Sequence, residues 1–241
     1  MFHAIILAAG RSSRMHEEPK AILPLAGKPA MKYILERLES LDIPTTVVLK
    51  HKKDEILVVF ENNLSHVTQG EEYGTGAALK SALDVLTHLS GQHILVLNAD
   101  DSAFLEAETL KKFSDFHLKQ KNILTVMTVH KDNPKGLGRI KKDGDHVIAI
   151  VEEKDATEEE KIIQEINTGM FLFEYDWLQK AIQEITPSPV TGEYYITQLL
   201  EIAIREGQKV GAYKLEDADE WFGFNTPEQY EEAEKKMSKM L

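Results

Sequence analysis

Hydrophobic residues along the first half of the chain alternate between short apolar runs and longer stretches in which apolar residues recur with helical spacing. The short runs predict β-strands at 4–8, 45–49, 94–97 and 122–129. The stretches with helical spacing predict α-helices at 31–41, 79–86 and 106–119. Pro29 opens the first helix at a position where a missing N–H costs nothing. Strands joined by helices in this way predict an α/β fold with a mostly parallel sheet and helices on both faces.

After residue 130 the pattern becomes richer in strands. A β-hairpin is predicted from 139–142 and 146–151 around an Asp143-Gly144 turn. Further elements are a short acidic helix at 157–163, strands at 166–173 and 209–215, and helices at 176–185 and 194–206. The last helix has Thr226 as N-cap, Pro227 at its first position and Gln229 closing a capping box. We expect one domain over 1–241, with a first lobe at 1–129, a smaller β-rich lobe at 130–225 and a C-terminal helix at 226–241.

Composition and charge exclude several classes of protein. No apolar run reaches eighteen residues, and the start of the chain lacks the basic region of a signal peptide, so we expect a cytoplasmic protein without a membrane partner. The 28 basic and 40 acidic side chains give a net charge of −12, which argues against nucleic acid as a partner. The chain contains no cysteine, so disulfides and thiolate chemistry are excluded.

The loop after the first strand has the opposite charge. Arg11, Arg14, Lys20 and Lys28 lie in a stretch whose only acids before residue 36 are at 17 and 18. Small residues at 8–10 let backbone N–H groups approach a ligand, and such a loop can hold phosphate. The loop is neither a Walker A motif nor the Gly-x-Gly-x-x-Gly of dinucleotide binders. A solvated basic loop is the alternative, but this combination of residues favours a pocket for a small anion.

Carboxylates follow the buried strand at 94–97. Asp100 and Asp101 lie where open α/β sheets place their ligands, and Mg²⁺ prefers one or two carboxylates with substrate phosphate oxygens. Asp100 is the better candidate, because Asp101 can instead cap the following helix or merely end the strand.

Polar and glycine residues mark three further segments. Gln69 precedes Gly74-Thr75-Gly76, which opens a helix and suits close contact with a base or a phosphate. In the second lobe, the segments 136–139 and 167–169 and the side chain of Glu152 lie at strand ends, where they can hydrogen-bond a polyol. Taken singly, each of these segments is more often turn chemistry than a ligand contact.

These motifs, in this order, resemble the nucleoside-diphosphate-sugar pyrophosphorylase superfamily of nucleotidyltransferases. Over essentially the whole chain they are similar to the uridylyltransferase domain of bacterial N-acetylglucosamine-1-phosphate uridylyltransferases. Besides the segments above, the similarity rests on the segments 138–140, 150–157, 165–169, 192–197 and 223–225.

The resemblance implies a Rossmann-like mixed sheet, in which the first lobe binds nucleotide and the second binds sugar. It also implies a Mg²⁺-dependent enzyme that joins UTP and N-acetylglucosamine 1-phosphate and releases pyrophosphate. The implied catalytic residues are Arg14, Lys20 and Asp100, and the implied metal ligands are Asp100 and Asn225. The implied nucleotide-binding residues are Leu7, Ala8, Ala9, Gly10, Gln69, Gly74 and Thr75. The implied sugar-binding residues are Gly138, Glu152, Asn167, Thr168, Tyr195 and Thr197.

The chain departs from that pattern in three places. Ser12 stands where the opening loop usually has a second glycine, and Asn98-Ala99 stands where Tyr-Gly usually precedes the aspartate. The hexapeptide-repeat acetyltransferase domain of the bifunctional enzymes does not follow residue 241, so only the nucleotidyl half-reaction is expected. These departures leave open another sugar 1-phosphate, phosphocholine or another nucleoside triphosphate as substrate, or a catalytically weakened regulator that binds nucleotide sugars. The oligomeric state is left open as well. The nine histidines show no metal-ligand spacing, and His88 and His93 are expected at the surface.

Overall fold

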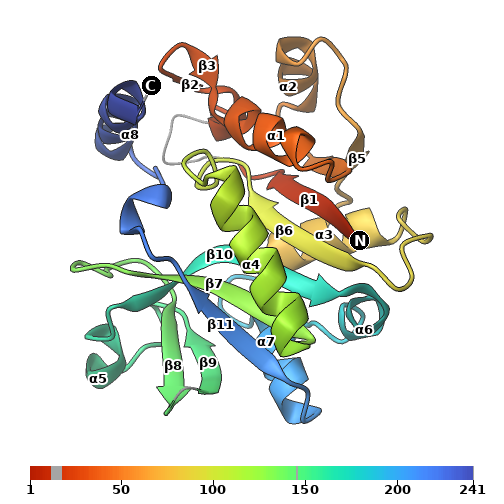
Figure 1. The fold of residues 1–241 in the computed structure, drawn as a ribbon, viewed down its shortest axis with the longest axis vertical. Coiled ribbons are helices and arrows are strands. Elements are labelled where there is room, and N and C mark those ends of the chain that lie inside the picture. The colour runs from red at the N-terminus through yellow and green to blue at the C-terminus, as the bar shows by residue number, and fades with distance from the viewer. Residues whose placement is uncertain (12–17, 145, 241) are drawn as a thin grey trace.

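A computed structural model describes residues 1–11, 18–144 and 146–240 (Figure 1). The strands are β1 (Phe2–Ala8), β2 (Pro24–Leu25), β3 (Lys28–Pro29), β4 (Thr45–Leu49), β5 (His66–Thr68), β6 (His93–Asn98), β7 (Leu124–His130), β8 (Arg139–Asp143), β9 (His146–Val151), β10 (Glu165–Glu174) and β11 (Val210–Lys214). The α-helices are α1 (Ala30–Ser40), α2 (Lys53–Val59), α3 (Thr75–Leu83), α4 (Ala107–Gln120), α5 (Glu158–Lys161), α6 (Tyr175–Ala181), α7 (Gln198–Arg205) and α8 (Pro227–Met240). Short 3₁₀ helices lie at Lys20–Ile22 (η2) and Ala218–Glu220 (η3).

One mixed sheet organises the molecule, with the strand order β11-β7-β10-β6-β1-β4-β5. Strand β1 pairs in parallel with β4 and β6, and β7 pairs in parallel with β11. Strand β10 runs antiparallel to its neighbours β6 and β7, and the β8–β9 hairpin joins the sheet through β10. The mixed, mostly parallel α/β fold predicted from the sequence is therefore confirmed. Since β10 lies between β6 and β7, residues 130–225 share this sheet with residues 1–129.

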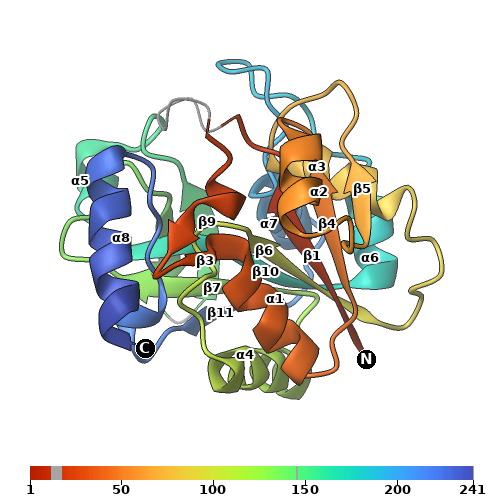
Figure 2. The same ribbon diagram turned by 90° about the horizontal axis from the view of Figure 1, so that it is seen from above.

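Helices cover both faces of the sheet (Figures 1 and 2). On one face, Ile5 of β1 packs in a core cluster with α3, α6 and α7. On the other face, Ala4 and Ile6 pack in a second cluster with α1 and α4. Successive strand residues point to opposite faces, so a strand covered on both sides needs an unbroken apolar run. The sequence 4–8 has that pattern. A third cluster joins α8 to α1 and β2 through Ala233, Tyr33 and Leu25.

Several local predictions are confirmed and others need correction. The β8–β9 hairpin and its Asp143-Gly144 turn are present, and α8 begins at Pro227. Pro29 is the N-cap of α1 and not its first residue. The helix expected from residue 194 begins only at Gln198, because residues before it form an isolated β-bridge and a turn. The sequence analysis also missed β5 and α2, a three-residue strand and a seven-residue helix with a single buried side chain.

His93 is not the surface residue that was expected, because it is half-buried on β6. Its Nδ1 lies 3.0 Å from Nε2 of His117, and Nδ1 of His117 lies 2.7 Å from Oγ1 of Thr125. Burial, and secondarily the nearby His93, lowers the pKa of the fully buried His117 to about 4. His88 is exposed, as predicted.

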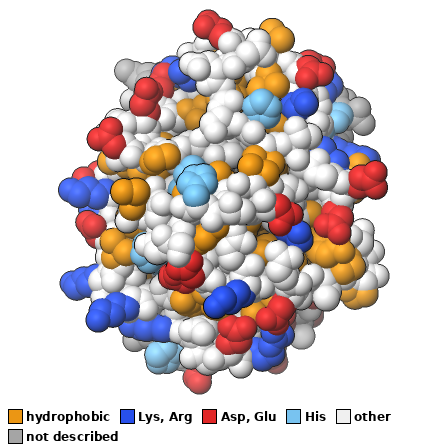
Figure 3. Space-filling model, turned by 90° about the vertical axis from the view of Figure 1, so that its right-hand side faces the viewer, with side chains coloured by type: hydrophobic (Ala, Val, Ile, Leu, Met, Phe, Trp, Pro, Cys, Tyr) orange, Lys and Arg blue, Asp and Glu red, His pale blue; other side chains and the backbone are white. Residues whose placement is uncertain are grey.

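Neither sign of charge forms a continuous patch on the face of the molecule in Figure 3. There, acidic and basic side chains are interspersed and apolar side chains occur in small groups between them. Within the described ranges, no helix is both long and apolar enough to span a bilayer.

Candidate active site

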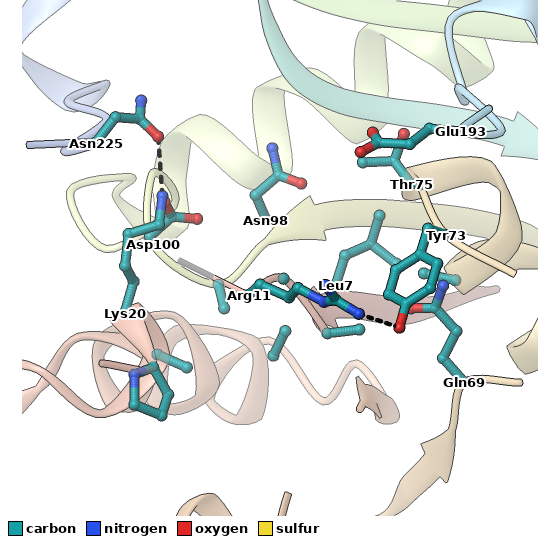
Figure 4. A pocket seen from close by; sticks show the side chains of 18 of the residues that line it. Leu7, Arg11, Lys20, Gln69, Tyr73, Thr75, Asn98, Asp100, Glu193 and Asn225 are labelled. Carbon is teal, nitrogen blue, oxygen red and sulfur yellow. Dashed lines mark hydrogen bonds and ion pairs between the residues drawn. The ribbon is translucent and has the colours of Figure 1, made fainter. Parts of the chain in front are cut away.

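A cavity of about 540 Å³ opens at the carboxyl ends of β1 and β6. Its size is typical of pockets that bind small molecules. Every predicted nucleotide-binding residue lines it, together with Lys20, Asp100, Asn225 and Tyr195. The remaining lining residues are Arg11, Pro19, Ala21, Tyr73, Ala78, Asn98, Ala99 and Glu193. Figure 4 shows two groups of polar side chains at opposite ends of this pocket.

The first group brings together three residues from distant parts of the sequence. Lys20 opens η2, Asp100 follows β6, and Asn225 precedes α8. The Lys20 ammonium forms an ion pair with Oδ2 of Asp100 and donates to Oδ1 of Asn225 at 3.0 Å (Figure 4). The Asn225 backbone N–H in turn donates to Oε1 of Gln229 at 2.7 Å, so the first turn of α8 holds Asn225 in place.

Lys20 determines the charge state of this group. Burial acts to raise the pKa of Asp100, but the charge and hydrogen bond of Lys20 outweigh it and hold that pKa below its ordinary value. Asp101 has the opposite balance, because burial and the neighbouring Asp100 raise its pKa well above the ordinary value. Asp101 is also absent from the pocket lining. Of these two aspartates, Asp100 is therefore the one that presents negative charge to the pocket.

The donor set of Asp100 and Asn225 fits a divalent cation such as Mg²⁺. Their oxygens already converge on one positive group, the Lys20 ammonium. Mg²⁺ needs only one or two protein oxygens when substrate phosphates supply further ligands. Among the residues that the structure describes, no group of three or more His, Asp or Glu side chains could hold a metal by itself. The site therefore suits a cation that arrives with a substrate.

The second group lies where α3 begins. Gly74, with φ of 106°, is the N-cap of α3, and a Cβ on it would lie 2.2 Å from the backbone oxygen of Tyr194. The same oxygen accepts from the N–H of Gly76 at 2.8 Å, and Oγ1 of Thr75 accepts from the N–H of Ile196 at 3.1 Å. Glycine is thus required for close contact between α3 and the 194–196 segment, which brings Tyr195 to the pocket.

Most of the predicted sugar-binding residues form a separate neighbourhood outside the pocket lining. The Asn167 N–H donates to the Gly138 carbonyl oxygen at 2.8 Å. A Cβ on Gly138 would lie 3.6 Å from both carboxylate oxygens of Glu152. Burial, then the nearby Asp155, raises the pKa of Glu152, and a hydrogen bond with Thr197 opposes the rise. The structure therefore brings together four of the predicted sugar-binding residues: Gly138, Glu152, Asn167 and Thr197.

Thr168 is placed differently from these four residues. Its side chain is buried, and its hydroxyl donates to the Met127 carbonyl oxygen at 2.8 Å. The hydroxyl therefore supports the β7–β10 pairing and is shielded from solvent.

Sequence reasoning missed three pocket residues and named one that cannot be placed. Tyr73 and Glu193 line the pocket, and each directly precedes or follows a glycine that the motifs contain. Asn98 was noted only as a departure from a motif, and it too lines the pocket. Arg14 lies within 12–17, outside the described residues, as does Ser12.

Comparison with protein families gives one match over most of the chain. Residues 4–184 match the model of the MobA-like NTP transferase domain. The chain is 38% identical over 233 residues to the bifunctional protein GlmU of Desulfitobacterium hafniense (strain DSM 10664 / DCB-2), covering 96% of this chain and 51% of the relative. It is 40% identical over 226 residues to GlmU of Streptococcus sanguinis (strain SK36), covering 92% of this chain and 49% of the relative. The chain thus spans about half the length of these curated relatives.

Solved structures share the fold at low sequence identity. A UDP-glucose pyrophosphorylase complexed with UDP-glucose superimposes with a TM-score of 0.80 at 17% identity, over the whole of both chains. HddC from Yersinia pseudotuberculosis, complexed with GMP-PN, superimposes with a TM-score of 0.72 at 23% identity, covering 98% of this chain and 99% of that one. At these identities the likeness concerns the fold.

Proposed function

Because this chain belongs to the family of MobA-like NTP transferase domains, we propose that it transfers a nucleoside monophosphate from a nucleoside triphosphate to a sugar 1-phosphate. The membership itself confirms the family predicted from the sequence motifs. Our proposal names UTP and N-acetylglucosamine 1-phosphate as the substrates, with UDP-N-acetylglucosamine and pyrophosphate as products. The two GlmU relatives support this choice over their first half, the part that the chain matches.

One observation carries the proposal. Lys20, Asp100 and Asn225 meet at one end of the pocket, 80 and 205 positions apart in sequence from Lys20, while Gln69, Gly74 and Thr75 line the other end. The end with Lys20 and the oxygens of Asp100 and Asn225, which can hold a cation, suits the triphosphate, and the end with the Gln69 amide and the Tyr73 ring suits a base. A nucleoside triphosphate carries its triphosphate at one end and its base at the other, so it can contact both ends of the pocket at once.

In the proposed reaction, the phosphate oxygen of the sugar 1-phosphate attacks the α-phosphorus of the nucleotide. An O–P bond forms there, the bond from the α-phosphorus to the bridging β-phosphate oxygen breaks, and its electron pair leaves on pyrophosphate. The nucleophile is already anionic, so no side chain has to remove a proton. The task of the protein is to bring two anions into line and to offset their charge.

In this scheme Lys20 offsets the negative charge of the phosphates. Asp100 and Asn225, which now hold its ammonium, would hold the cation, and Lys20 would then contact the phosphates. Bound Mg²⁺ would supply charge neutralisation at the phosphates. Arg14 is proposed as a second phosphate contact. Leu7 through Gly10 place backbone groups against the nucleotide.

The sugar is proposed to lie between the pocket and the second lobe. Tyr195 lines the pocket, and Thr197, two residues later, hydrogen-bonds Glu152. Glu152 and Asn167 flank Gly138, where little room remains for a side chain. With the Thr168 hydroxyl bonded to Met127, we assign the polar sugar contacts to the other residues of this set.

The proposal is tested by pyrophosphate release from the purified protein with UTP, Mg²⁺ and N-acetylglucosamine 1-phosphate. Glucose 1-phosphate and phosphocholine replace the sugar, and CTP, dTTP, ATP and GTP replace UTP, in parallel reactions. Turnover with UTP and the N-acetylated sugar supports the proposal in full. Binding of UTP without turnover of any acceptor would contradict it and indicate a nucleotide-binding regulator.

A different acceptor is the second candidate, and Asn98 favours it. Asn98 lines the pocket in the motif position where tyrosine is usual, and a Cβ on Gly169 would lie 2.4 Å from its Nδ2. The amide thus packs tightly against the second lobe, next to the proposed sugar position. Turnover only with glucose 1-phosphate or phosphocholine would retain the mechanism and change the acceptor.

A further inference from the structure

Tyr73 presents an exposed aromatic surface at the end of the pocket where α3 begins. It lies between β5 and α3, directly before Gly74, and 40% of its surface remains exposed. Figure 4 shows its ring beside Gln69, at the opposite end of the pocket from Lys20 and Asp100. Neither the motifs nor the proposed reaction assigns a role to this ring.

The ring is held in place by neighbours that do not depend on a ligand. The Lys50 ammonium lies 3.5 Å from the ring centroid and donates to the carbonyl oxygens of Glu71 and Glu72, both at 2.9 Å. The Tyr73 carbonyl oxygen accepts from the N–H of Tyr194 at 2.8 Å. A flat surface fixed in advance loses little conformational entropy when a ligand packs on it.

Arg11 contacts the same ring from the other side of the pocket opening. Its guanidinium carbon lies 4.5 Å from the ring centroid, and Nη2 donates to the Tyr73 hydroxyl at 2.5 Å. Arg11 is exposed and follows Gly10 in the pocket-lining loop after β1. An exposed cation–π contact is weak, so the guanidinium can leave the ring when a more strongly charged partner enters.

We propose that Tyr73 is the platform on which the nucleobase stacks, and that Arg11 leaves the ring for the phosphates when the nucleotide enters. This inference rests on the proposed function, which places the phosphates at the Lys20 end and therefore the base at the Tyr73 end. Every nucleobase has a flat π face, and proteins commonly stack such faces on aromatic side chains. The exposed part of the Tyr73 ring supplies that surface.

The test compares two ligands that share the triphosphate and differ in the nucleoside, that is, in the ribose and the base. Isothermal titration at fixed free Mg²⁺ measures the Kd of UTP and of inorganic tripolyphosphate for the wild type, Tyr73→Ala and Tyr73→Phe. Tyr73→Ala is expected to weaken UTP binding by roughly 5- to 100-fold and to change tripolyphosphate binding by less than about twofold. Tyr73→Phe keeps the ring and loses only the acceptor for Arg11, so its Kd for UTP is expected within about threefold of the wild type, or lower.

Three results would contradict the proposal that the base stacks on Tyr73. The first is Tyr73→Ala binding UTP as tightly as the wild type. The second is an equal loss for UTP and tripolyphosphate, which would mean that Tyr73 only positions the loop or Arg11. The third is a loss in Tyr73→Phe as large as in Tyr73→Ala, which would assign the effect to the hydroxyl. The proposed function fails in a different way, by UTP binding without pyrophosphate release from any acceptor.

Discussion

Replacing Lys20 by methionine should separate metal binding from turnover. In the structure the Lys20 ammonium occupies the position between Asp100 and Asn225 that a divalent cation would take. Under the proposed function, Lys20 would compete with Mg²⁺ for these oxygens before the nucleotide binds and would help to neutralise the phosphates afterwards. Methionine has a similar length and removes the charge, so these two roles predict changes of opposite sign.

The magnitudes follow from the contacts that are lost. A positioned donor that acts on developing charge is worth about 3 kcal/mol in the transition state, so kcat/KM should fall by roughly 100-fold. A hydrogen bond between charged groups is worth about 1.5–3 kcal/mol, and the two side chains here are only 18% and 16% exposed. Removal of the competing ammonium should then tighten Mg²⁺ binding by roughly 10- to 100-fold.

Pyrophosphate release gives kcat/KM, and titration with Mg²⁺ in the absence of nucleotide gives the metal affinity. Lys28→Met is the matched control, because Lys28 pairs with Glu36 at 2.7 Å outside the pocket lining. It should leave both quantities near wild type. Turnover of Lys20→Met within about threefold of the wild type, or a weaker affinity for Mg²⁺, would refute the reasoning.

Three further predictions test the metal ligand, the buried histidine and the α3 cap. Asp100→Asn should lower kcat/KM by at least roughly 100-fold, whereas Asp101→Asn, outside the pocket lining, should cost much less; equal losses in the same pyrophosphate assay would contradict the assignment. Burial lowers the folded-state pKa of His117 to about 4, so the unfolded chain binds more protons between pH 6.5 and about 4, and acidification through this range should remove up to about 3 kcal/mol of stability. Urea unfolding should show a flatter pH dependence in His117→Gln, and an unchanged slope would count against this account. Gly74→Ala should lower the free energy of unfolding by at least about 2 kcal/mol, and by clearly more than Gly91→Ala, which has positive φ (+74°) but open space around the new Cβ; equal losses would mean that the contact with Tyr194 is unimportant.

Much of the site was predictable because it lies close to signals that are local in sequence. Asp100 follows a buried apolar run, and a parallel strand in an open sheet carries its ligands at its carboxyl end. Gly74 and Thr75 open a helix, as their position before an apolar stripe predicted. Tyr73 and Glu193 escaped notice, since a single tyrosine or glutamate in a loop has no periodic pattern that marks it.

The sequence by itself determined most of the longer strands and helices and which of their faces are buried, but not β5 or α2. The continuous run at 4–8, for example, requires cover on both sides, and β1 has it from α1 and α3. Only the tertiary structure decided the antiparallel place of β10 between β6 and β7, the contact between His93 and His117, and the meeting of Lys20, Asp100 and Asn225. The physical reason is that hydrophobic periodicity reports the local conformation and the burial of each element. Strand order and the distances between remote side chains depend instead on how the completed apolar faces pack against one another.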